Sequence, residues 1–136
     1  MEIFNLSDDV KVFGFRVTTF PTGIGEAFES LIKMIPGGFD RPYYGISYRG
    51  QDGQMVYIAA AQEKYEDEAE KYNCEKYTIQ KGEYLAITVY DWRKKTDSIN
   101  EVFHKIIQDN RVDKTKPAVE WYKDDHEMVC MVQTNH

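Results

Sequence analysis

The sequence predicts an α+β fold in which a strand-helix-strand-strand unit occurs twice, with one main helix in each copy. The first observation is that this order of elements can be assigned twice along the chain. The second is a residue repeat at an offset of 75 positions: Ala27-Phe28, Leu31-Ile32 and Pro42 correspond to Val102-Phe103, Ile106-Ile107 and Pro117. Because neither half could bury its helix and sheet face alone, we expect two antiparallel-sheet repeats about a pseudo-twofold axis, with a groove between them.

A single domain is expected over 1–136, since this length suffices for one sizeable hydrophobic core. The first repeat covers about 10–61 and the second about 77–133. Between them, the segment 62–76 mixes glutamates and lysines, which is typical of a solvated link or a short helix. We assign this connector no chemistry.

The first repeat begins with an alternating apolar pattern, which indicates a strand. A proline and glycine turn interrupts the strand, and an apolar stripe at helical spacing follows until Pro36. Two further strands flank the turn-forming loop 49–53. The predicted elements are a strand over 10–19, a helix over 24–35 and strands over 42–48 and 54–61.

The second repeat follows the same order. Its first strand contains Lys81-Gly82, at which we expect a kink rather than an end. A polar turn precedes a helix with its own apolar stripe, and two short strands close the chain. The predicted elements are a strand over 77–90, a helix over 98–109 and strands over 117–122 and 128–133.

Charge and composition narrow the function. The net charge of −6 disfavours nucleic-acid binding, which needs a basic surface, and is compatible with a cationic or neutral ligand. The ten tyrosines offer large apolar rings with polar tips, which suit a binding surface. No leader-like or membrane-spanning pattern is visible, so we expect a cytoplasmic protein with no membrane partner.

The cysteines and histidines do not form a metal-binding pattern. Cys74 and Cys130 are far apart in the chain, and His104, His126 and His136 are not spaced as ligands beside them. We therefore expect neither a metal nor a cofactor, and a reduced environment for both thiols.

Glu120 is the residue that most directly indicates a function. It is a single carboxylate within the strand over 117–122, between Val119 and Trp121, and at the offset of 75 it aligns with Gly45.

One face of the second repeat, which we expect to meet the helix, carries Leu85, Ile87, Val89, Val119 and Trp121. The other face carries Tyr84, Thr88, Tyr90, Glu120 and Tyr122. An acid among aromatic rings suits a lipophilic cation. The alternative is an ordinary solvent-facing glutamate on a half-exposed strand.

Three stretches of the chain resemble GyrI-like small-molecule-binding domains, the effector-binding domain superfamily of bacterial transcription activators. They are Ile79-Gln80-Lys81-Gly82-Glu83-Tyr84-Leu85-Ala86, Tyr43-Tyr44-Gly45-Ile46-Ser47-Tyr48 and Val119-Glu120-Trp121-Tyr122. The resemblance extends from about Val10 to Gln133 and implies the duplicated fold with a hydrophobic groove between the repeats. It also implies that Glu120 meets cationic ligands. The expected ligand-binding residues are Glu120, Tyr84, Thr88, Tyr90, Tyr122, Tyr43 and Gly45, with Trp92 as a lid over the groove.

Three functions remain open at this point. The first is a stand-alone bacterial binding protein that senses or sequesters bulky aromatic, cationic compounds. The second, which the resemblance implies for some stand-alone members, is a hydrolase of cyclopropane-containing electrophiles that uses Glu120 and Tyr84. The third is a protein-binding module that antagonises a toxin or contacts gyrase or a regulator. Either a monomer or a homodimer is compatible with all three.

Overall fold

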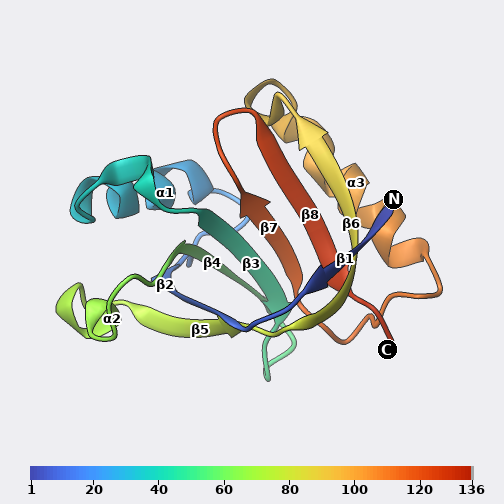
Figure 1. Cartoon of the computed structure of the whole chain (residues 1–136), viewed down its shortest axis with the longest axis horizontal. Helices are drawn as coiled ribbons and strands as arrows, with labels where there is room; N and C mark the ends of the chain where they lie inside the picture. Colours follow the sequence, from blue (N-terminus) through green and yellow to red (C-terminus); the bar gives the residue numbers. More distant parts are fainter. Residues whose placement is uncertain (136) are drawn as a thin grey trace.

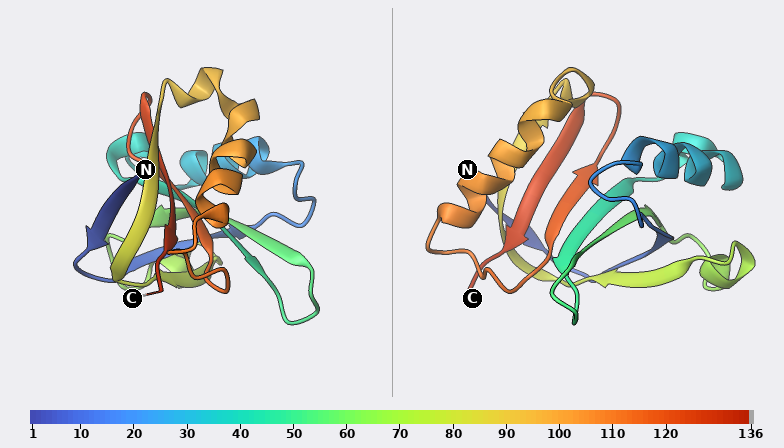
Figure 2. Two further views of the ribbon diagram at one scale, coloured as in Figure 1. Left: turned by 90° about the vertical axis from the view of Figure 1, so that its right-hand side faces the viewer. Right: turned by 180° about the vertical axis from the view of Figure 1, so that it is seen from behind.

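The computed structural model describes residues 1–135, with all of their side chains except that of Phe39, so His136 lies outside the described residues. The chain forms one eight-stranded antiparallel sheet with two main helices on one side (Figures 1 and 2). The strands are β1 (Glu2–Leu6), β2 (Val10–Arg16), β3 (Tyr43–Arg49), β4 (Met55–Gln62), β5 (Glu75–Ile79), β6 (Gly82–Tyr90), β7 (Ala118–Tyr122) and β8 (Glu127–Gln133). The α-helices are α1 (Ile24–Met34), α2 (Glu68–Lys71) and α3 (Ile99–Gln108). Short 3-10 turns occupy Gly38–Asp40, Trp92–Lys94 and Thr96–Ser98.

The predicted fold class is confirmed: β2-α1-β3-β4 and β6-α3-β7-β8 form the two repeats. The strand order is β1-β6-β8-β7-β3-β4-β2-β5, so β7 and β3 join the repeats at the centre of the sheet. Each repeat also receives an edge strand from outside its own unit, since β1 pairs with β6 and β5 pairs with β2. The pseudo-twofold axis therefore passes through the β3–β7 seam.

The sheet curls strongly because its edges are tied together by short links. Three residues connect β1, at one edge, to β2 near the other, and two residues connect β5 to β6. The links also touch, since the Lys81 backbone N–H donates to Asp9 Oδ1 at 2.8 Å. The result is a half-barrel with an inner face and an outer face (Figure 1).

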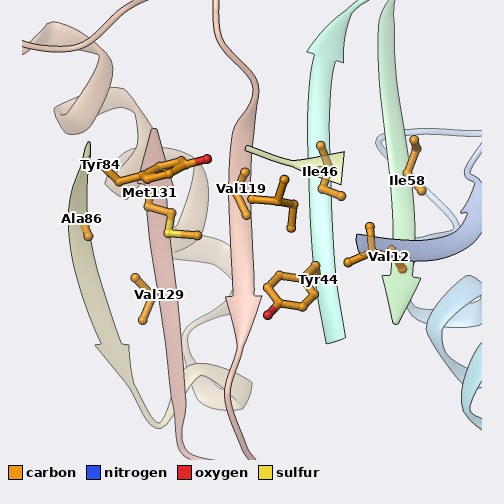
Figure 3. Close-up of a cluster of buried hydrophobic side chains, with 11 residues drawn as sticks. Val12, Tyr44, Ile46, Ile58, Tyr84, Ala86, Val119, Val129 and Met131 are labelled. Atoms are coloured by element: carbon orange, nitrogen blue, oxygen red, sulfur yellow. The ribbon is translucent and has the colours of Figure 1, made fainter. Parts of the chain in front are cut away.

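Both faces of the half-barrel are buried. The inner face carries the cluster drawn in Figure 3, which includes Val12, Tyr44, Ile46, Ile58, Tyr84, Ala86, Val119, Val129 and Met131. On the outer face, α3 packs on Leu85, Cys130 and Val132, and α1 packs on Phe13, Tyr43 and Ala61. Across residues 1–135, no helix is long and apolar enough to cross a bilayer.

One prediction about an individual element was wrong. The strand expected over 77–90 is two strands, β5 and β6, which lie near opposite edges of the sheet. The chain turns at Gln80-Lys81, and Gly82 adopts a φ of 141°, a backbone conformation that favours glycine. The connector contains α2, the short helix that was one of its two expected forms, and it also contains the start of β5. The N-terminal residues add β1, where no element was predicted.

The predicted faces of β7 were also reversed. Val119 and Trp121 belong to the inner cluster, where Trp121 packs on Phe4 and stacks on Tyr44. Ala118 and Tyr122 pack on the outer side, so Glu120 shares the face of the helices. The assumption that only the helix-facing side is apolar fails because the curled sheet also buries its inner face.

Candidate functional site

Glu120 lies at the seam between the repeats. The offset that relates the two halves takes Gly45 to Glu120, and these same residues are Cα partners across β3 and β7. They therefore occupy the pseudo-twofold axis, on the face that bears α1 and α3. Glu120 is half-buried, so the alternative of an ordinary solvent-facing glutamate is wrong.

Two tyrosines hold the Glu120 carboxylate. The Tyr57 hydroxyl, from β4, donates to Oε1 at 2.5 Å, and the Tyr122 hydroxyl donates to the same oxygen at 3.1 Å. Gly45 makes this arrangement sterically feasible, because a Cβ at that position would collide with the Tyr57 hydroxyl and with Glu120 Oε1. The sequence predicted a carboxylate in one repeat and bare backbone at the matching position of the other. In the structure the side chain that Gly45 lacks leaves the space for the Glu120 carboxylate and the Tyr57 hydroxyl.

Aromatic rings from both repeats surround the two tyrosines. Phe20 stacks on Tyr57 with centroids 5.1 Å apart. Phe28 and Trp92 meet Tyr122 edge-on, at 5.4 and 4.9 Å. We call Phe20, Phe28, Tyr57, Trp92 and Tyr122 the aromatic cluster. All but Tyr57 are half-buried, so their rings remain partly accessible beside the acid.

Raised pKa values keep the Tyr57 and Tyr122 hydroxyls protonated, and Glu120 forms no ion pair with a described residue. Burial raises the pKa of Glu120, and the hydrogen bonds from Tyr57 and Tyr122 offset part of that rise. Burial and then the nearby Glu120 charge raise the pKa values of Tyr57 and Tyr122 well above the usual range. Within residues 1–135, Glu120 has no ion-pair partner, and both of its hydrogen bonds reach Oε1. Oε2 therefore accepts no hydrogen bond from the described residues.

The structure brings together only part of the predicted site. Tyr122, Gly45 and Trp92 lie at Glu120, and Trp92 is anchored by donating from Nε1 to the Asp124 carbonyl at 2.9 Å. Tyr43 shares the outer face, but its hydroxyl donates to the Gly38 carbonyl. Its role as a ligand contact stays a prediction.

Three predicted residues lie elsewhere. Tyr84 is on the inner face, 2% exposed, and its hydroxyl donates to the Gln80 carbonyl at 2.5 Å. Thr88 and Tyr90 alternate with the helix-facing Ile87 and Val89, so they also point away from Glu120. A Glu120–Tyr84 pair is therefore wrong, for the same reason that the β7 faces were reversed.

Three members of the aromatic cluster were not predicted from the sequence. Phe20 was treated as part of a strand break, Phe28 as a core residue of the helix, and Tyr57 only as part of a strand. One signal was available for Phe20: it lies in the link between β2 and α1, as Trp92 lies in the link between β6 and α3. Nothing in the local pattern around Tyr57 could reveal its contact, which joins residues 63 positions apart.

Cys130 lies directly beneath the site. It is the Cα partner of Glu120 across β7 and β8 and is fully buried. Burial, and secondarily the charge of Glu120, raises the pKa of this thiol to about 12, so it packs as a neutral side chain. No group of three potential metal ligands occurs among residues 1–135.

The Tyr57 hydroxyl is expected to control the acidity of Glu120. In Tyr57→Phe the ring remains but the hydrogen bond that lowers the pKa of Glu120 is lost, so that pKa should rise further. NMR titration of the Glu120 carboxyl carbon measures the change. Tyr44→Phe is the matched control, since its hydroxyl donates to Gln62 on the inner face and its loss should leave Glu120 unaffected. Equal pKa values in wild type and Tyr57→Phe would contradict the assignment.

Comparisons with known proteins reveal likeness in structure only. No protein-family model and no curated protein sequence matches the chain. The structure of SAV2435 bound to tetraphenylphosphonium superposes with a TM-score of 0.70 at 15% identity, covering 98% of this chain and 93% of that one. An integron cassette protein from the mobile metagenome of Vibrio cholerae gives 0.68 at 14% identity, covering 98% and 95%. A hydrolase from Listeria innocua gives 0.58 at 12%, covering 98% and 90%. The chain thus shares the whole fold of these proteins.

Proposed function

We propose that this chain is a GyrI-like small-molecule-binding protein that takes bulky aromatic cations between α1 and α3. The observation that carries the proposal is the half-buried carboxylate of Glu120, which has no cationic partner within residues 1–135 and is flanked by the aromatic cluster. A desolvated charge without a partner is costly, and a ligand cation would remove that cost. Sensing or sequestration of such compounds is the role we assign to it.

The chemistry of the site supports a lipophilic cation over a neutral compound. Ring faces and edges attract a cation through their quadrupoles, and the surrounding apolar area favours a bulky body. The rings come from both repeats, so a ligand at Glu120 would bridge them. SAV2435, which shares the fold, was captured with a cation of this class, tetraphenylphosphonium.

The test is a calorimetric titration with tetraphenylphosphonium and with neutral triphenylphosphine oxide. For the cation we expect Glu120→Gln to weaken binding about thirtyfold or more, because the charge pairing is lost while the shape is kept. For the neutral compound we expect little change. Tyr44→Phe, on the opposite face of β3, serves as the control for loss of a tyrosine hydroxyl away from the site.

The pH dependence gives an independent check. Cation binding needs the ionised carboxylate, and the pKa of Glu120 is raised. Wild-type affinity should therefore fall as the pH drops through that raised pKa, beginning above the usual glutamate range, whereas Glu120→Gln should show no such step. If both ligands bind equally well to wild type and variant, the proposal fails.

Hydrolysis of an electrophile is the second candidate, favoured by the Tyr57 and Tyr122 hydroxyls that converge on a carboxylate of raised pKa. Glu120 would take a proton from water as the water oxygen bonds to a ring carbon, and one C–C bond of the cyclopropane would break. A tyrosine hydroxyl would donate a hydrogen bond to the group that receives the electron pair of that bond, and the proton held by Glu120 would then neutralise it. Tyr57 or Tyr122 replaces Tyr84 in this role. The test is mass analysis of a cyclopropane-containing electrophile after incubation with the protein. A hydrated product formed by wild type and not by Glu120→Gln would support the hydrolase function.

A further inference from the structure

We propose a second ligand site, on the inner face of the half-barrel, that binds a small aromatic carboxylate. The site is a cavity of about 230 Å³, walled by β5 and the β5–β6 link, by the starts of β6 and β7, and by the end of β8. It lies on the opposite face of β7 from Glu120, since Val119 lines it and successive strand residues point to opposite faces. It is therefore a different site from the one proposed for cations.

The interior of this cavity suits a flat ring. Its deepest residues, Ile79 and Val119, are 2% and 3% exposed. One wall is the ring of Tyr77, which is held by stacking on Tyr48 with centroids 5.8 Å apart. Tyr84 forms another wall, and Figure 3 shows its ring reaching from β6 toward Val119. Apolar depth beside an aromatic wall favours an aromatic body.

The charge at the cavity is opposite to that of the chain as a whole. Of the described residues that line it, Lys116 alone carries a charge, in a protein of net charge −6. Lys116 is half-buried and forms no ion pair within residues 1–135. An ammonium at the cavity that is not tied up in an ion pair favours an anionic ligand.

The neighbouring acids are engaged elsewhere. Asp113 accepts the Thr115 backbone N–H at 3.0 Å and the Thr115 hydroxyl at 2.6 Å. These bonds are the main cause of its lowered pKa, to which Lys116 adds a smaller part. Asp9 accepts the Lys81 backbone N–H across the two links. Neither acid lines the cavity.

A second donor in the wall is also unused. The Tyr77 hydroxyl has no hydrogen-bond partner among residues 1–135, whereas the Tyr84 hydroxyl is committed to the Gln80 carbonyl. An ammonium and a phenol can together satisfy the two oxygens of one carboxylate. The volume lies below the roughly 300–1,000 Å³ of sites for drug-sized ligands, so a single ring with one carboxylate is the ligand class that fits.

The test is a ¹⁵N NMR titration of the whole chain with benzoate, neutral benzamide and cationic benzylamine. We expect benzoate, but neither of the others, to shift the amide signals of Ile79 and Val119. Lys116→Gln should weaken benzoate about tenfold, since a charge-assisted hydrogen bond is lost, and Tyr77→Phe should weaken it a few-fold. Lys114→Gln is the matched control, because Lys114 is exposed in the same segment and does not line the cavity.

Two outcomes would overturn the proposal. One is that benzamide or benzylamine shifts the same signals as strongly as benzoate, or that Lys116→Gln and Lys114→Gln bind benzoate equally. The other is that benzoate moves the signals of Trp92 and Tyr122 instead, which would place it at the cation site. Glu120→Gln separates the two sites: it should leave benzoate binding unchanged whether or not cation binding at Glu120 is real.

Discussion

Replacing Gly45 with alanine is expected to weaken tetraphenylphosphonium binding by more than tenfold and to destabilise the fold by about 1–3 kcal/mol. The new methyl group would occupy the position now taken by the Tyr57 hydroxyl and Glu120 Oε1. Tyr57 is buried, so both the tyrosine ring and the carboxylate must shift and the hydrogen bond that positions Glu120 is disrupted. Calorimetric titration and urea unfolding of the same preparation measure both effects.

The control for this substitution is another glycine. Gly25 lies in α1, and a methyl group added there would have no other atom within 4 Å. Gly25→Ala should therefore leave binding unchanged and add roughly 0.5–1 kcal/mol of stability through helix propensity. Adding Tyr57→Phe to Gly45→Ala removes the nearest of the three colliding atoms and should recover part of the lost stability. Wild-type affinity in Gly45→Ala would show that the carboxylate position is not what determines binding.

Replacing Glu68 with glutamine is expected to cost about 3–5 kcal/mol of unfolding free energy. Glu68 and Arg41 form an ion pair at 2.8 Å with both side chains 4% exposed. Oε1 of Glu68 also accepts the backbone N–H groups of Lys64 and Tyr65. Glutamine can keep those two bonds but leaves the buried guanidinium without its counter-charge. The pair ties Arg41, two residues before β3, to the connector between the repeats, so its loss affects the whole fold.

Two comparisons isolate the effect of burial. Arg16 and Glu75 form an exposed pair at 3.1 Å, so Glu75→Gln should change stability by less than about 1 kcal/mol. Adding Arg41→Met to Glu68→Gln removes the stranded charge and should restore part of the loss. If Glu68→Gln unfolds at the same urea concentration as Glu75→Gln, the buried pair does not stabilise the fold.

The pH dependence of the Glu68 contribution has a definite sign. Burial alone would raise the pKa of Glu68, but the hydrogen bonds from Lys64, Tyr65 and Arg41 outweigh it and the pKa is lowered. Its contribution to stability is therefore complete above the ordinary glutamate pKa and is lost as the pH falls through the lowered value. Glu120 has the opposite sign, because its raised pKa means that its ionisation opposes folding as the pH rises.

The sequence by itself determined the duplication, the two main helices and the singular position of Glu120. Helix stripes repeat at one offset because each helix must present the same apolar face to its sheet, and that constraint is local. The same offset paired Glu120 with Gly45, and the structure places these two residues side by side. These features could be read without knowing how the strands are ordered.

Only the tertiary structure decided which side chains meet Glu120. Strand alternation identifies a face reliably when one face is polar, but here the inner face packs on itself and the outer face packs on the helices. With both faces apolar, the pattern Val119-Glu120-Trp121 was compatible with either orientation, and the wrong one put Tyr84 at the acid in place of Tyr57. Because the short links curl the sheet, its inner face is buried and apolar instead of polar. The sequence therefore lacks the alternation of polar and apolar residues that would have distinguished the two orientations.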